Sequence, residues 1–157
     1  MKHTISILVE NHAGVLARVA GLFARRGFNI DSLAVGVTED EKISRITIIA
    51  DGTAYTLEQI EKQLNKLIDV IKVRHLPAEE LLSRELVLIK VACQPSQRAE
   101  LISLAEIAKA KISDITVNTM TLELSDSVPR IKTFEELLRP YGIKETVRTG
   151  SIAMQKG

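Results

Sequence analysis

The chain has 157 residues, enough for one ordinary domain or two small ones, and 45% of them are hydrophobic, which is sufficient for a buried core. With 21 Lys and Arg against 20 Asp and Glu, the formal net charge is only +1, so no global field favours nucleic acid or an anionic membrane as a partner. No apolar run approaches the roughly 18 residues that a membrane-spanning helix needs, and we expect a cytoplasmic protein.

The first half of the chain predicts the element order strand, helix, strand, strand, helix, strand. Residues 4–10 alternate as in a strand, and apolar residues recur at helical spacing over residues 15–26. Residues 28–37 form the next expected strand, but their apolar phase changes near Asp31 and Ser32, which predicts a bulge. A strand over 42–50, a helix with capping-box spacing at Thr56 to Gln59, and a strand over 70–76 complete the unit.

The second half repeats this order after a linker or single helical turn at 78–83. The expected strands cover residues 84–92, 111–117, 119–124 and 143–147, and Pro95 and Pro129 each open a helix. The order predicts an α+β fold of two tandem ferredoxin-like βαββαβ domains, residues 1–77 and 84–157. Cys93 stands in the apolar run Val91-Ala92-Cys93 and is interpreted as a small buried hydrophobic residue, so neither a thiol nucleophile nor a metal site is indicated.

The turn between the first strand and the first helix is the main candidate site. Gly14 stands where the strand stops, and a helix start exposes backbone N–H groups with partial positive charge. The N–H groups of Gly14, Val15 and Leu16 could therefore hold a small carboxylate. Taken alone, Asn11 and Gly14 are as well explained as turn-forming residues.

The residues Glu10-Asn11-x-x-Gly14-Val15-Leu16-x-Arg18 resemble the ACT domain, a regulatory module that binds amino acids. The longer segments Gly21 to Leu33, Ser44 to Thr47 and Gln59 to Leu67 resemble the small regulatory subunits of acetolactate synthase, also called acetohydroxyacid synthase. Short anchors at Arg84 to Val91 and Arg148 to Gly150 extend the likeness over nearly the whole chain.

This resemblance implies a non-catalytic subunit with no active site of its own. It would activate a large catalytic subunit and transmit feedback inhibition by valine or a related branched-chain amino acid. The resemblance also implies that thiamine diphosphate, Mg and FAD belong only to the large subunit. Asn11, Gly14 and Asn29 match the family's effector-binding residues, whereas Ala13 is a mild departure at a position where relatives carry proline, serine or another small residue.

The expected sheet order gives the effector site a physical rationale. Residues 28–37 form an edge strand whose apolar side chains favour pairing with a second copy of the chain. A two-fold axis makes that pairing antiparallel, so Asn29 of one subunit would meet Asn11 and Gly14 of the other. Val15, Leu16 and Ile30 are the expected apolar walls, which would favour valine over alanine by roughly 1 to 3 kcal/mol.

The same residues also bear on other functions that this fold can have. An RNA-recognition module has a similar fold but stacks bases on sheet aromatics, and only 3% of this chain is aromatic. An acylphosphatase-like enzyme would need an arginine in the first loop, where this chain has His12 and Ala13. His12 has no evident partner for acid-base catalysis. A free-standing tandem amino-acid sensor, acting on a transcription or transport partner, remains an alternative.

Overall fold

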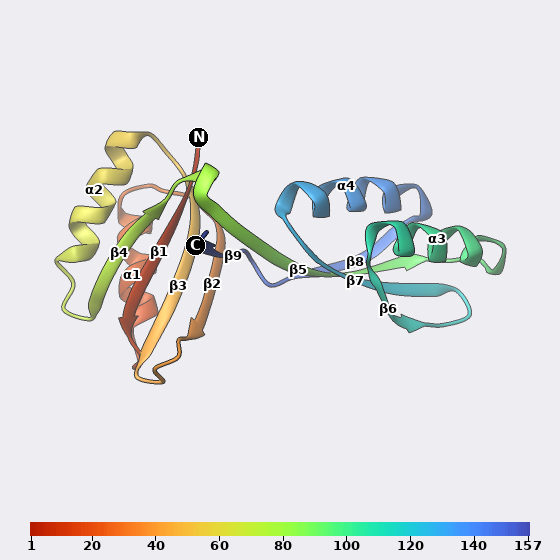
Figure 1. Ribbon diagram of the computed structural model, residues 1–157, viewed down its shortest axis with the longest axis horizontal. Coiled ribbons are helices and arrows are strands. Elements are labelled where there is room, and N and C mark those ends of the chain that lie inside the picture. Colours follow the sequence, from red (N-terminus) through yellow and green to blue (C-terminus); the bar gives the residue numbers. More distant parts are fainter. The chain divides into compact units, whose positions relative to one another are not determined.

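The computed structural model describes residues 1–157 and divides the chain into two α+β units (Figure 1). The first unit comprises Met1–Leu82 together with Ser151–Gly157, and the second comprises Ser83–Gly150. Each unit has an antiparallel sheet with two helices packed on one face. The predicted pair of ferredoxin-like βαββαβ units is therefore confirmed. None of the helices has the length and apolarity that a bilayer crossing requires.

The first unit follows the predicted element order. Its elements are β1 (Lys2–Glu10), α1 (Val15–Arg25), β2 (Ile30–Val37), β3 (Ile43–Asp51), α2 (Ala54–Asn65) and β4 (Val70–Leu76), followed by the short 3₁₀ helix η1 (Ala78–Glu80). The strand order is β2-β3-β1-β4, so β2 lies at an edge as expected. The predicted bulge is also present, since the pairing of β2 with β3 shifts register between Ile30 and Ser32.

The core of the first unit lies between the sheet and its two helices. Alternate residues of β1, namely Ile5, Ile7 and Val9, point into it because successive side chains of a strand face opposite sides of the sheet. They meet fully buried residues of the helices such as Phe23 and Leu64. The remaining β1 side chains, including Ser6 and Leu8, therefore lie on the open face.

Helix α2 begins three residues earlier than the capping-box pattern predicted. Its N-cap is Thr53, whose side chain accepts a hydrogen bond from the Thr56 backbone N–H at 3.2 Å. The Thr56 hydroxyl in turn accepts from the Thr53 backbone N–H at 2.8 Å. The placement of the cap at Thr56 was wrong because a threonine can also occupy the third helical position of a reciprocal cap, and these two residues satisfy each other.

The second unit contains most of β5 (Leu81–Ala92), then η2 (Pro95–Gln97), α3 (Arg98–Ala108), β6 (Lys111–Ile115), β7 (Thr119–Asp126), α4 (Val128–Leu138), η3 (Arg139–Tyr141) and β8 (Ile143–Arg148). The strand order is β6-β7-β5-β8. Cys93 is buried in the core beside Val91, as predicted. Pro95 opens the 3₁₀ turn that leads into α3.

The last residues form a strand that the periodicity did not predict. Strand β9 (Ile152–Gln155) belongs to the first unit, whereas the predicted second domain extended to residue 157. Strand β9 pairs with β5, and two hydrogen bonds from the residues that flank it add to this pairing: Ser151 N–H donates to Ser32 Oγ at 2.7 Å, and Lys156 N–H donates to the Glu80 carbonyl at 2.8 Å. Four residues are too short for a secure alternation pattern, so only its partners define this strand.

Candidate effector turn

The turn between β1 and α1 has the geometry of an open helix start. Gly14 is the N-cap of α1, with φ +88° and ψ −14°, a left-handed conformation that glycine adopts without steric cost. No side chain caps the helix, although the Gly14 carbonyl accepts a hydrogen bond from Arg18 N–H at 3.1 Å. The backbone donors of the first helical turn therefore remain available to an anionic group.

Asn11 attaches this turn to the hairpin between β2 and β3. Its backbone N–H donates to the Lys42 carbonyl at 2.8 Å, and its side-chain Nδ2 donates to the Glu41 carbonyl at 2.9 Å. Both contacts cross from one loop to another that lies far away in the sequence. Asn11 thus positions the turn through its amide nitrogen, a role that its turn-forming propensity alone did not indicate.

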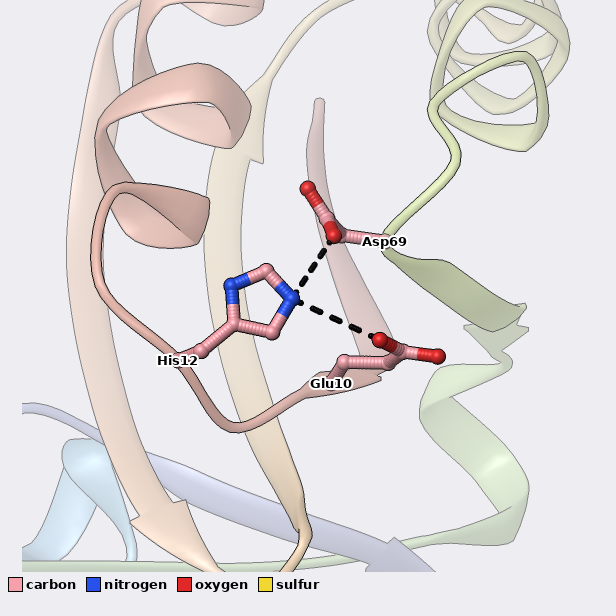
Figure 2. Close-up of side chains that lie close together, drawn as sticks. All are labelled: Glu10, His12 and Asp69. Atoms are coloured by element: carbon pink, nitrogen blue, oxygen red, sulfur yellow. Dashed lines mark ion pairs between the residues drawn. The ribbon is translucent and has the colours of Figure 1, made fainter.

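His12 has two acidic partners, contrary to the sequence interpretation. Figure 2 shows its imidazole directed toward Glu10, at the end of β1, and Asp69, just before β4. The His12 Nε2 atom lies 2.9 Å from Asp69 Oδ1 and 3.4 Å from Glu10 Oε2. The second oxygen of Asp69 pairs with the Arg18 guanidinium. Sequence reasoning missed this cluster because Asp69 comes from another element.

The contacts of this cluster hold the turn between β1 and α1 in place. Glu10, His12 and Asp69 each offer one ligand atom within 4.8 Å of the others, a spacing that a divalent cation could also use. The Arg18 guanidinium already pairs with one carboxylate oxygen of Asp69, His12 contacts the other, and the Asp69 side chain is largely covered. These contacts connect the end of β1, the first turn of α1 and the start of β4, so they fix the loop that carries the predicted effector residues to three elements of the unit.

The predicted site residues fall into two groups. Asn11, Ala13 and Gly14 are exposed in the turn, and Leu16 is 40% exposed at the start of α1. Val15, expected as a pocket wall, is only 3% exposed and belongs to the core. The second group is Asn29, which is exposed just before β2, and Ile30, which is half-buried against the core.

These two groups lie at opposite ends of the sheet within one chain. Ile30 pairs with Ala50, and Ala50 pairs with His3 near the start of β1. The effector turn follows Glu10 at the other end of that strand. At about 3.3 Å per residue, the separation along β1 is about 20 Å. A single chain therefore does not bring Asn29 and Ile30 to the turn.

Comparisons with known proteins give one family along the chain. Residues 5–72 match the family described as AHAS small subunit-like ACT domain, and residues 84–157 match the family described as small subunit of acetolactate synthase. A probable acetolactate synthase small subunit from Archaeoglobus fulgidus is 50% identical over 157 residues, covering 100% of this chain and 98% of the relative. The acetolactate synthase small subunit of Mycobacterium leprae is 44% identical over 155 residues, covering 99% of this chain and 92% of the relative.

A solved structure gives the same result. The crystal structure of the acetolactate synthase small subunit from Thermotoga maritima superposes with a TM-score of 0.93 at 39% sequence identity, covering 100% of this chain and 98% of that one. The family matches and the structural superposition thus both cover the two halves of the chain. The chain belongs to the family of acetolactate synthase small subunits.

Proposed function

We propose that this chain is a regulatory subunit that activates the large, thiamine-diphosphate-dependent subunit of acetolactate synthase. It also transmits feedback inhibition by valine or a related branched-chain amino acid. Catalysis, with thiamine diphosphate, Mg and FAD, belongs in this proposal to the large subunit. The likeness to named small subunits along the full length supports the assignment.

The observation that carries the effector part of the proposal is the exposed edge of the first sheet. Leu33, Val35 and Val37 lie on one side of the edge strand β2 and are 36%, 49% and 63% exposed. Apolar edges of this kind tend to pair with another strand. Two copies of β2 related by a two-fold axis would pair antiparallel and bury this stripe in a homodimer.

Such a dimer would complete the effector site. Antiparallel pairing places the start of one β2, with Asn29, beside the end of the other, where the second subunit presents its turn from Asn11 to Leu16. The open N–H groups of the turn would take the amino acid's carboxylate, and the Asn29 amide offers an acceptor for its ammonium group. Each dimer would then hold two equivalent sites.

Feedback requires more than tight binding. A ligand that binds two arrangements of the subunits equally well changes neither population, so valine must stabilise one interface arrangement over the other. A site formed by two subunits can provide this difference, because its two halves separate or approach when the interface changes.

The decisive experiment reconstitutes the enzyme. The chain is mixed with the large subunit from the same source, and acetolactate formation is measured with and without valine. We expect the chain to raise the large subunit's activity and valine to lower it again. Failure to activate a large subunit that is itself active would contradict the proposed regulatory role.

A further inference from the structure

The open face of the first sheet has a small hollow on the side opposite α1 and α2. Ser6 and Leu8 of β1 line its floor, and residues 153–155 of β9 cover it from the other side. Its volume is about 90 Å³. That volume is enough for several water molecules or for one tetrahedral oxyanion. The hollow is separate from the effector turn, which begins a helix on the opposite face.

Three cationic side chains surround this hollow: Arg45 of β3 and Lys72 and Arg74 of β4. The strand register explains why they converge. Leu8 pairs with Arg45 on one side and with Lys72 on the other, so these two cations flank β1 on one face of the sheet. Arg74 lies one step further along β4, opposite Ser6. Grouping like charges in this way is unfavourable without a counter-charge.

No acidic side chain of the protein neutralises this group. None of the ion pairs in the structure involves any of the three cations. Arg74 donates instead to the neutral side-chain carbonyl of Gln155, whose amide nitrogen donates to Glu80 at 2.8 Å. The Nε atom of Arg45 is buried and has no hydrogen-bond partner. A buried donor without a partner is costly, and an oxygen of a ligand in the hollow would satisfy it.

We propose that this hollow binds a phosphate group, either free or at the end of a small metabolite. A tetrahedral dianion presents oxygens in several directions, which suits two guanidinium groups, one ammonium group and the Ser6 hydroxyl arranged around it. A carboxylate, with two coplanar oxygens, would satisfy one arginine and leave the other cations unpaired. The bound phosphate joins β1, β3 and β4 to β9, and so fixes the C-terminal strand to the sheet.

The test titrates inorganic phosphate into the full chain by calorimetry, at low ionic strength in a phosphate-free buffer. We expect one site per chain, and Lys72→Gln and Arg45→Gln each to weaken binding by about tenfold. Arg26→Gln removes an exposed cation from the end of α1 and serves as the charge-matched control, with no change expected. Phosphate should also shift the backbone amide resonances of Ser6 and Ala153. Lys72 is exposed, so its variant remains informative if Arg45→Gln fails to fold.

Methyl phosphate and malonate separate the chemical classes of ligand. Binding of methyl phosphate as well as inorganic phosphate supports a metabolite's terminal phosphate, whereas binding of inorganic phosphate alone supports the free ion. Malonate binding as tightly as phosphate would overturn the proposal in favour of a carboxylate site. The absence of any heat or resonance shift at millimolar phosphate would also refute it. So would an equal loss of phosphate affinity in Arg26→Gln and Lys72→Gln, which would indicate diffuse charge attraction only.

Discussion

Individual side chains of the turn before α1 serve mainly to hold it in place. Asn11 uses its amide nitrogen on the Glu41 carbonyl, and His12 and Arg18 both contact Asp69. In the dimer that we propose, the groups that remain for an effector are the backbone donors at the helix start and the Asn29 amide of the second subunit. Substitutions at Gly14 and Asn29 should therefore affect effector binding more directly than substitutions in the ion-pair cluster.

Gly14→Asp and Asn29→His should each abolish valine binding while the dimer remains intact. Aspartate at position 14 would place a negative charge beside the effector's carboxylate, and its Cβ would come within 3.4 Å of the Arg18 guanidinium. Histidine at position 29 would replace the amide with a bulkier ring. Calorimetry with valine measures the loss, sedimentation confirms the dimer, and Asn65→His at the exposed end of α2 is the control. Unchanged affinity in both variants would exclude this pocket.

Asp126 should make the second unit sensitive to acid. Burial raises the pKa of this carboxyl, but the Ser127 backbone N–H at 2.7 Å and Arg130 at 2.8 Å outweigh burial and hold the pKa below its usual value of 3.8. A carboxyl with a lowered folded pKa contributes stability above the unfolded pKa and loses it as pH falls through the folded pKa. Asp126→Asn should therefore reduce stability at pH 7 by about 0.5 kcal/mol.

This difference should shrink as the pH falls from 3.8 through the lower folded pKa of Asp126, where the wild-type carboxyl also becomes neutral. Urea unfolding of both proteins at neutral and acidic pH measures it. Asp114→Asn, at an exposed carboxyl without an ion pair, should show no such convergence. If the free energies of unfolding of the wild type and Asp126→Asn differ by the same amount at neutral and at acidic pH, the Asp126 carboxylate charge is not responsible for the difference.

Sequence reasoning located the contiguous part of the candidate site and missed its long-range contacts. The turn from Asn11 to Leu16 could be predicted because strand, glycine and helix patterns adjoin in the sequence. The Asp69 partner of His12 could not, because that contact depends on how β4 pairs with β1. The convergence of Arg45 and Lys72 likewise depends on strand register, which alternation alone does not determine.

Among the strands, β2 carries exposed apolar side chains at a sheet edge that nothing within the single chain buries. Its position at the edge followed from the ferredoxin-like order, and its bulge followed from a change of apolar phase. The cap of α2 and strand β9 were not predicted. Both are short segments whose structure depends on hydrogen bonds to their partners, and so few residues carry no clear periodic pattern. Long periodic elements were thus predictable, and short ones were not.

Val35→Lys should disrupt the dimer that we propose through β2. A lysine there would carry an unpaired charge into the interface, and we expect the dimer dissociation constant to rise by more than about tenfold. Ile71→Lys is a matched control, since Ile71 is 50% exposed on the opposite edge strand β4 and Val35 is 49% exposed. Light scattering after size-exclusion chromatography reports the mass. A Val35→Lys protein that stays dimeric at low concentration would exclude pairing through β2.

The whole molecule contains two separate cores, one for each unit. The first core depends only on residues before Leu82, but the open face of its sheet also contacts the C-terminal segment. Within that segment Ser151 and Ala153 are buried, at 1% and 8% exposure. The first unit is therefore discontinuous in sequence, although each family match covers a continuous stretch.

Removing residues 151–157 should destabilise the first unit selectively. The truncation uncovers the open face of the sheet and deletes the hydrogen bond from Ser151 N–H to Ser32 Oγ. Hydrogen exchange measured by mass spectrometry should show faster exchange in β1 and β2, with α3 and β7 unchanged. Equal protection of β1 in the two proteins would mean that β9 contributes nothing to that sheet.

The discontinuous first unit has a consequence for synthesis on the ribosome. Residues 1–82 emerge first and can form their helix-covered core, but the strand that covers the other face is translated only after the whole second unit. The whole second unit is made, and can fold, in the interval. During that interval the open face of the first sheet, with its grouped cations, is accessible to chaperones and other nascent chains. An expression fragment of the first unit alone should accordingly join residues 151–157 to residue 82 through a short linker.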